Sequence, residues 1–369
     1  MYRIVPSGAA INGEYAYFSA RDYNALLRTN LHTYNTEYLC KFERETCNER
    51  IHIKAFSHED DVWFIPLYGE HIAKYNIKNN NLKYFKLDIG RHSSASIKEC
   101  SIFDDGNDEE YSPTFLYANL IDDERIFMVP AALNNLIVLN MNAEKMDKIE
   151  FEYNFENELF SLGISKGDKI WLLPYSGTEM VALDYKTGNC SRIKMPEGMQ
   201  GYYGGAVLDN GFVISESNSR YYLYSEESNE FECINTGIKS EGKNGNKVRE
   251  MIRYKDNIYF LPNCSEEIFI LNTKSKCITQ IENNYGFVLG MLQFVTVKDD
   301  KLICYSFTEG IFFVIEGNKI AECIKCEIDD NTLNKLLIEK YGSNVIEKVS
   351  INGVISEESM GLNNYLKLL

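Results

Sequence analysis

The stretch Ile258-Tyr-Phe-Leu-Pro262 sets a pattern that recurs along this chain of 369 residues. An aliphatic residue, an aromatic residue, two more apolar residues and a proline follow one another in the same order at residues 62–66, 126–130 and 170–174. Three copies without the proline keep the register at residues 16–20, 211–215 and 302–306. Five of the six intervals between successive copies are 41 to 47 residues long. This period, with one insertion, indicates seven repeats of one structural unit.

Each copy lies between segments that predict further short strands. A polar turn such as Lys255-Asp256-Asn257 comes before it, as at the tip of a hairpin. A loop and a second β-rich run follow, for example at residues 268–272, and then a turn and a fourth run at residues 277–281. No amphipathic helix separates the strands, so a parallel βαβ sheet is excluded.

Four short antiparallel strands, repeated seven times, predict an all-β fold: a seven-bladed β-propeller. The run from Ile258 to Thr273 resembles the repeats of kelch-like and related bacterial propellers, and the likeness to propellers extends over residues 8–328. The paired glycines of kelch strands, the Trp-Asp dipeptide of WD40 repeats and the sialidase turn are absent from the sequence, which leaves the subfamily open. The predicted blades span residues 8–43, 51–87, 114–152, 159–195, 202–234, 247–281 and 291–328.

The remaining segments are expected to lie outside the blades. Residues 1–328 form the predicted propeller, with an insertion at 90–113 between the second and third blades, and residues 329–369 form a short, partly helical C-terminal appendage. Asp329-Asp330-Asn331 and Gly342 mark the ends of a helix from Thr332 to about Tyr341. A hairpin is expected at residues 349–355. We expect the appendage to lie across one face or against the junction of the first and last blades.

Charge and cysteine content limit the partners and the compartment. With 38 Lys+Arg against 54 Asp+Glu, the formal net charge of −16 argues against nucleic acid or an anionic membrane as the main partner. No secretory leader or membrane-spanning apolar run is visible, and ten cysteines are too few for a disulfide scaffold, so a cytoplasmic protein is expected.

The sequence contains no strong metal or cofactor motif, and none is predicted. Cysteines recur in the predicted fourth strands, where buried packing is the expected role; they are Cys40, Cys190, Cys233, Cys277 and Cys323. The pair Cys323 and Cys326 has a metal-ligand spacing, but no second pair accompanies it. The acidic run at residues 104–110 fails the EF-hand spacing because its glycine comes too early. We attribute Gly204 and Gly205 to crowding of an inner strand near the axis.

Propellers bind their ligands on the face formed by the loops that join the second to the third strand of a blade and one blade to the next. The register places tyrosines, carboxylates and amides there, which suit a sugar, a peptide or a protein loop. The candidate ligand-binding residues are Arg21, Asp22, Tyr23, Tyr68, Glu70, His71, Asn134, Tyr175, Glu179, Glu216, Arg220, Asn263, Glu266 and Glu309. The same groups could also be polar loop residues that repeat with the fold.

Two functions follow from this pattern. The first is a non-catalytic binding or scaffold propeller that recognises a protein or glycan through this face. The second is an enzyme of propeller fold that acts on a sugar or sugar acid, with Asp22, Glu70, Glu179 or Glu266 as acid or base; a pair of carboxylates about 5–10 Å apart would support it.

Overall fold

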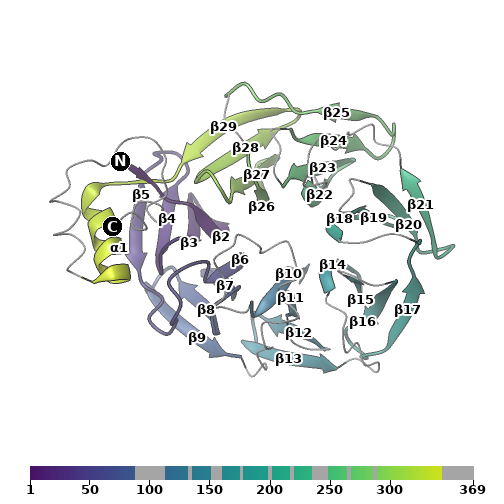
Figure 1. The fold of residues 1–369 in the computed structure, drawn as a ribbon, viewed down its shortest axis with the longest axis horizontal. Coiled ribbons are helices and arrows are strands. Elements are labelled where there is room, and N and C mark those ends of the chain that lie inside the picture. Colours follow the sequence, from purple (N-terminus) through teal and green to yellow (C-terminus); the bar gives the residue numbers. More distant parts are fainter. Residues whose placement is uncertain are drawn as a thin grey trace.

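Seven four-stranded antiparallel sheets surround a common centre in the computed structural model, which confirms the predicted propeller (Figure 1). The structure describes residues 1–87, 113–131, 135–150, 160–174, 178–197, 202–216, 220–234, 248–263, 267–285 and 289–342. Most of the predicted insertion and the predicted hairpin at 349–355 therefore lie outside the described residues. Each sheet is built from consecutive strands, so each blade is one continuous segment of the chain.

The strands of each blade run in order from the centre outward. The innermost strands are β2 (Pro6–Asn12), β6 (His52–His58), β10 (Phe115–Asp122), β14 (Phe160–Lys166), β18 (Tyr202–Leu208), β22 (Val248–Tyr254) and β26 (Leu292–Lys298). The second strands are β3 (Tyr15–Ala20), β7 (Asp61–Pro66), β11 (Arg125–Pro130), β15 (Lys169–Pro174), β19 (Gly211–Glu216), β23 (Asn257–Pro262) and β27 (Lys301–Ser306). The third strands are β4 (Leu26–Asn30), β8 (His71–Asn76), β12 (Asn135–Asn140), β16 (Glu179–Asp184), β20 (Tyr221–Ser225), β24 (Phe269–Asn272) and β28 (Ile311–Glu316). The outer strands are β5 (Thr36–Cys40), β9 (Asn81–Lys86), β13 (Lys145–Glu150), β17 (Cys190–Lys194), β21 (Glu230–Ile234), β25 (Ile278–Gln280) and β29 (Lys319–Lys325).

The repeated apolar motif is the second strand of each blade, and it is buried on both faces. Trp63, Phe64 and Ile65 of β7 have no exposed surface, as expected for a strand that packs against the blades on either side. One register prediction is wrong. The copy in the fifth blade ends at Glu216, one residue later than predicted. Glu216 pairs with Tyr202, the first residue of its inner strand, just as Pro66 pairs with His52 in the second blade.

A capped turn joins the third and fourth strands in six blades. The last residue of the third strand accepts a hydrogen bond from the backbone two or three residues later, and the fourth residue after it has a left-handed backbone. Such side-chain turns fix the hairpin geometry locally. The capping residues are Asn30, Asn76, Asn140, Asp184, Ser225 and Asn272, and the left-handed residues are Tyr34, Asn80, Glu144, Gly188, Asn229 and Lys276.

Four of the recurring cysteines lie in outer strands and Cys277 directly precedes β25, and the expectation that these cysteines are buried is wrong for two of them. Cys233 and Cys277 are exposed, and Cys40, Cys190 and Cys323 are half-buried. The physical reason is that the fourth strand is the edge of its sheet, where alternate side chains face solvent. Close packing near the axis does explain Gly205, since a Cβ there would lie 2.6 Å from Ile164 of the neighbouring blade.

The ring is closed by the two ends of the propeller segment. Strand β1 (Tyr2–Arg3) pairs with β30 (Glu327–Ile328), and the amide of Ile4 donates to the carbonyl of Cys326 at 2.8 Å. Gly310 lies against this junction with a positive φ, and a Cβ there would lie 2.6 Å from the carbonyl oxygen of Ile4. First and last blades therefore meet through backbone pairing as well as side-chain packing.

Helix α1 (Asp330–Tyr341) covers this junction; it ends as predicted and begins two residues before the predicted Thr332. The Asp329 side chain accepts from the amide of Thr332 at 2.8 Å, and Gly342 is the C-cap. Leu333, Leu336 and Leu337 are buried in one apolar cluster with residues of the first and seventh blades. Within the described part of the chain, no helix has the length and apolar character to cross a membrane.

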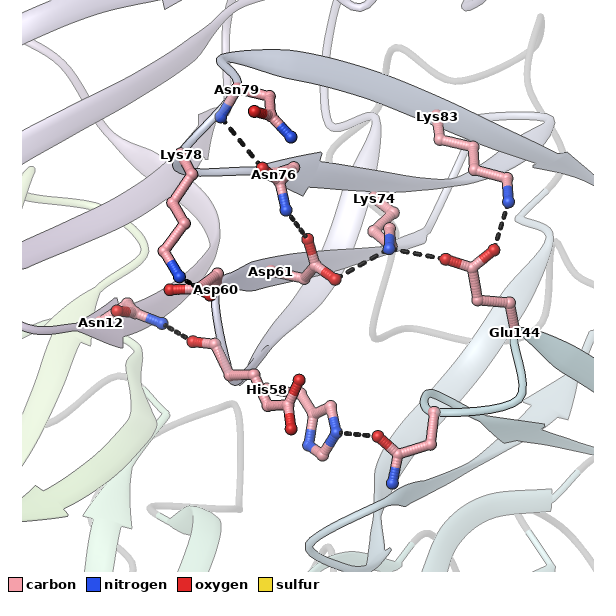
Figure 2. Close-up of polar contacts among 12 residues, drawn as sticks. Asn12, His58, Asp60, Asp61, Lys74, Asn76, Lys78, Asn79, Lys83 and Glu144 are labelled. Carbon is pink, nitrogen blue, oxygen red and sulfur yellow. Dashed lines mark hydrogen bonds and ion pairs between the residues drawn. The ribbon is translucent and has the colours of Figure 1, made fainter.

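A network of charges joins the second and third blades on the opposite face from the predicted binding loops (Figure 2). Lys74 Nζ lies 2.8 Å from Asp61 Oδ2 and 2.6 Å from Glu144 Oε1, which comes from the third blade. Asn76 donates to the other oxygen of Asp61, and Lys83 also pairs with Glu144. The Lys74 side chain is only 14% exposed, so these bonds are better shielded from water than a surface pair.

We predict that packing of α1 stabilises the propeller. Leu336→Ala should lower the free energy of unfolding by about 2–4 kcal/mol, because it removes a buried side chain from the junction of the first and seventh blades. Chemical denaturation measures the change. The control is Ile338→Ala in the same helix, where the side chain is 41% exposed, and it should change stability by less than about 0.5 kcal/mol. Equal effects of the two substitutions would contradict this role for the helix.

Candidate functional site

The first and seventh blades are joined on the loop face by Arg21. Its guanidinium contacts Asp22 at 3.0 Å and donates to the backbone carbonyl of Phe307 at 2.9 Å. The Tyr23 side chain beside it is buried, and this burial raises its pKa. Lys340 of α1 lies above the Tyr23 ring and donates to the Asp22 carbonyl at 2.7 Å. These three predicted site residues therefore lie close together and hold loops of two blades and the helix.

A buried carboxylate that the sequence analysis missed organises the loop of the second blade. Glu45 accepts hydrogen bonds from the backbone amides of Glu70 at 2.6 Å and His71 at 3.0 Å, and its Oε1 lies 3.2 Å from His71 Nδ1. Burial raises the pKa of Glu45, and the adjacent His71 opposes this rise. Tyr68, in the same loop, is only 5% exposed. The carboxylate therefore holds the loop in one conformation.

The remaining candidate residues are spread round the ring. Glu179 Oε2 lies 3.0 Å from Arg192 of the next strand. The side chain of Glu216 is fully buried, and Arg220 contacts both of its oxygens at 2.6 and 2.7 Å. Asn263 and Glu309 are half-buried. Asn134, Tyr175 and Glu266 lie outside the described residues.

An ion pair crosses the centre of the ring between two residues that are each the third residue of an inner strand. The third residues of the seven inner strands are Gly8, Lys54, Tyr117, Leu162, Gly204, Glu250 and Phe294. Lys54 of the second blade and Glu250 of the sixth blade lie 2.6 Å apart, although these blades are not neighbours. Glu250 also accepts from the amide of Phe294 at 2.8 Å. Both charged side chains are about five-sixths buried, at 16% and 14% exposure.

Aromatic hydroxyls surround this ion pair. Burial raises the pKa of Tyr117, and the charge of Glu250 raises it further. The same two effects, in the same order, raise the pKa of Tyr305, which donates to Gln293. The sequence register could have revealed Lys54 and Glu250, since they are the two charged residues among the seven third positions. Their contact across the ring required the three-dimensional arrangement.

His52 is buried and does not share a site with His71. Its ring lies between Phe42, with centroids 4.4 Å apart, and Phe64, at 5.3 Å. Neither ring nitrogen has a hydrogen-bond partner, and burial lowers the pKa of His52 to about 3. Among the described residues, no three His, Cys, Asp or Glu side chains are grouped as metal ligands would be.

Comparison with known proteins identifies the fold. No protein-family model matches the sequence, and no curated protein matches it significantly. Many solved structures match the fold. BamB from Moraxella catarrhalis matches with a TM-score of 0.52 at 11% identity, over 83% of each chain. The computationally designed protein Ika8 matches with a TM-score of 0.54 at 9% identity, over 87% of each chain.

KlHsv2 with its loop 6CD replaced by a Gly-Ser linker gives a TM-score of 0.50 at 8% identity, over 84% of this chain and 92% of that one. At these identities the likeness establishes the propeller architecture alone. The kelch-like character of the repeat stays a prediction.

We predict that the central ion pair is coupled. Lys54→Met should lower the free energy of unfolding by about 3 kcal/mol, because it leaves the Glu250 carboxylate buried without its cation. The double variant with Glu250→Gln should recover most of this loss, since glutamine is neutral and keeps an acceptor for the Phe294 amide. Denaturation of the parent, both single variants and the double variant measures the coupling. Additive losses would show that the two charges do not interact.

We predict that His52 makes the protein sensitive to acid. The unfolded chain binds a proton below pH about 6.5 that the folded chain excludes down to about 3, so stability falls as the pH drops through this window. The free energy of unfolding of His52→Met, measured relative to that of the parent, should therefore be about 2 kcal/mol higher at pH 5 than at pH 7.5. Denaturation at the two pH values tests this, with His32→Met at an exposed turn as the control. A pH-independent difference between parent and His52→Met would refute the prediction.

Proposed function

We propose that this protein is a non-catalytic binding or scaffold propeller that recognises a partner protein through its loop face. The supporting observation is that the polar groups of this face are held by bonds within the chain. Arg21 joins two blades, and Glu45 fixes the loop that contains Glu70 and His71. Such a face is preorganised, so a partner would not have to order it on binding.

The ion pair at the centre of the ring also favours recognition of a partner at the loop face. The Lys54–Glu250 pair crosses the ring, and its charges neutralise one another. A partner that approaches the loop face meets exposed polar side chains of the first and seventh blades and of the linker after the first blade. These include Glu43, Arg44, Thr46 and Thr308. Mixed charge of this kind gives specificity to a protein interface.

The enzymatic alternative has less support from the same residues. Asp22 and Glu179 are each bound by an arginine, and Glu70 accepts from Thr46 at 3.5 Å. The described carboxylates thus take part in local loop contacts. Glu266 lies outside the described residues.

Site-specific photo-crosslinking in cells tests this proposal. A photoreactive amino acid at Thr46 or at Thr308 should crosslink one and the same partner, because both positions are exposed on the loop face. The controls are Asn79 and Ser228, which are exposed in turns on the opposite face. Crosslinks to that partner from the control positions at equal yield, or none from the loop face, would count against the proposal.

A further inference from the structure

Several tyrosines in the described part of the chain form a hydrogen bond between the ring hydroxyl and a carboxylate, and three of these pairs can be compared. Tyr38 bonds to Glu339, Tyr254 bonds to Asp300 and Tyr34 bonds to Glu322. In the first two pairs a lysine of the chain completes the arrangement. These two pairs therefore show that a tyrosine–carboxylate pair of this protein can hold a cation.

In each of the first two pairs a lysine lies over the tyrosine ring, and in the second it also contacts the carboxylate. Lys335 lies 4.0 Å from the centre of the Tyr38 ring. Lys255 lies 5.0 Å from the centre of the Tyr254 ring and 3.0 Å from Asp300. A cation over an aromatic face and beside a carboxylate gains from both contacts.

The third pair has no such cation. Within the described residues, no lysine or arginine forms an ion pair with Glu322 or lies over the Tyr34 ring. A second tyrosine lies beside it, because Tyr285 donates to the carbonyl of Ala321 at 2.7 Å and interacts electrostatically with Tyr34. Tyr34 comes from a turn of the first blade and Tyr285 from the segment between the sixth and seventh blades, and both bond to residues of β29. Both are unusually exposed, at 47% and 43%.

The turn that contains Tyr34 requires a left-handed backbone at this position, as the equivalent turns of five other blades do. Its φ is +64°, in the left-handed region that asparagine and glycine tolerate best. The equivalent positions of other blades hold Asn80, Glu144, Gly188, Asn229 and Lys276, so Tyr34 is the one aromatic residue among these six turn positions.

We propose that Tyr34, Tyr285 and Glu322 form a binding site for a cationic side chain, arginine or lysine, of a partner polypeptide. The Glu322 carboxylate forms an ion pair with the cationic group, and the faces of the exposed rings lie against that group. Lys255 contacts Tyr254 and Asp300 in this way within the chain. The net charge of −16 favours approach of a cationic partner. This site lies at the outer rim and is independent of the proposed function of the loop face.

Calorimetric titration with a short peptide of alternating arginine and glycine tests this site. Tyr34→Asn should weaken binding about fivefold while the melting temperature stays equal or rises, because asparagine relieves the backbone strain. Tyr285→Ser should weaken binding similarly and provides a second variant at unchanged net charge. Glu322→Gln should also weaken binding. Its matched control is Asp300→Asn, which removes the same charge from a pair that Lys255 already fills.

The proposal is overturned if the parent protein does not bind the peptide, or if Tyr34→Asn and Tyr285→Ser leave the affinity unchanged. It is also overturned if Asp300→Asn weakens binding as much as Glu322→Gln, since the attraction would then be a general effect of net charge. Binding of a neutral oligosaccharide at these tyrosines in place of the peptide would overturn it as well.

Discussion

Each blade of this protein is a single sheet whose middle strands are apolar on both faces, so each blade must be covered on both sides. Trp63 of β7 and Trp171 of β15 show the consequence, since both are almost fully buried between blades. Only a closed ring satisfies this requirement for every blade. The first and last blades therefore have to meet, and the pairing of β1 with β30 and the packing of α1 provide the contact.

Closure of the ring also positions the groups that could act on other molecules. Arg21 reaches the seventh blade only because the ring is closed, and Lys54 reaches Glu250 for the same reason. Rigid second strands end at the loop face, where the buried Glu45 accepts from backbone amides of one loop and Arg220 of another loop binds the buried Glu216. The loop face thus depends on the same packing that stabilises the fold.

The sequence predicted the architecture well because each repeat contains its own strand and turn signals. The apolar motif around Ile258 and the polar turn before it are local features, and so are the caps of α1. The register of the fifth blade was missed because Glu216 stands where four other blades have the proline that marks the strand end. Arg220 binds both oxygens of this buried glutamate and so compensates its charge.

The candidate site was less predictable, because the partners of its residues come from distant parts of the chain. No sequence motif marks Glu45 or Lys54, because Glu45 binds amides 25 and 26 residues further along the chain and Lys54 binds Glu250 of a distant blade. The cysteines of the outer strands misled for a related reason, since the exposure of Cys277 follows from its place at a sheet edge. The signals for strands and turns lie within each repeat, whereas the surroundings of a polar side chain depend on how the blades are arranged in the ring.

Amide hydrogen exchange tests most directly whether the junction of first and last blades holds the ring together. In a variant with Leu333, Leu336 and Leu337 replaced by alanine, the amides of β2 and β26 should exchange faster, while those of β14 on the far side of the ring keep most of their protection. Unchanged protection of β2 and β26, or an equal loss in all seven blades, would contradict the central role of this junction.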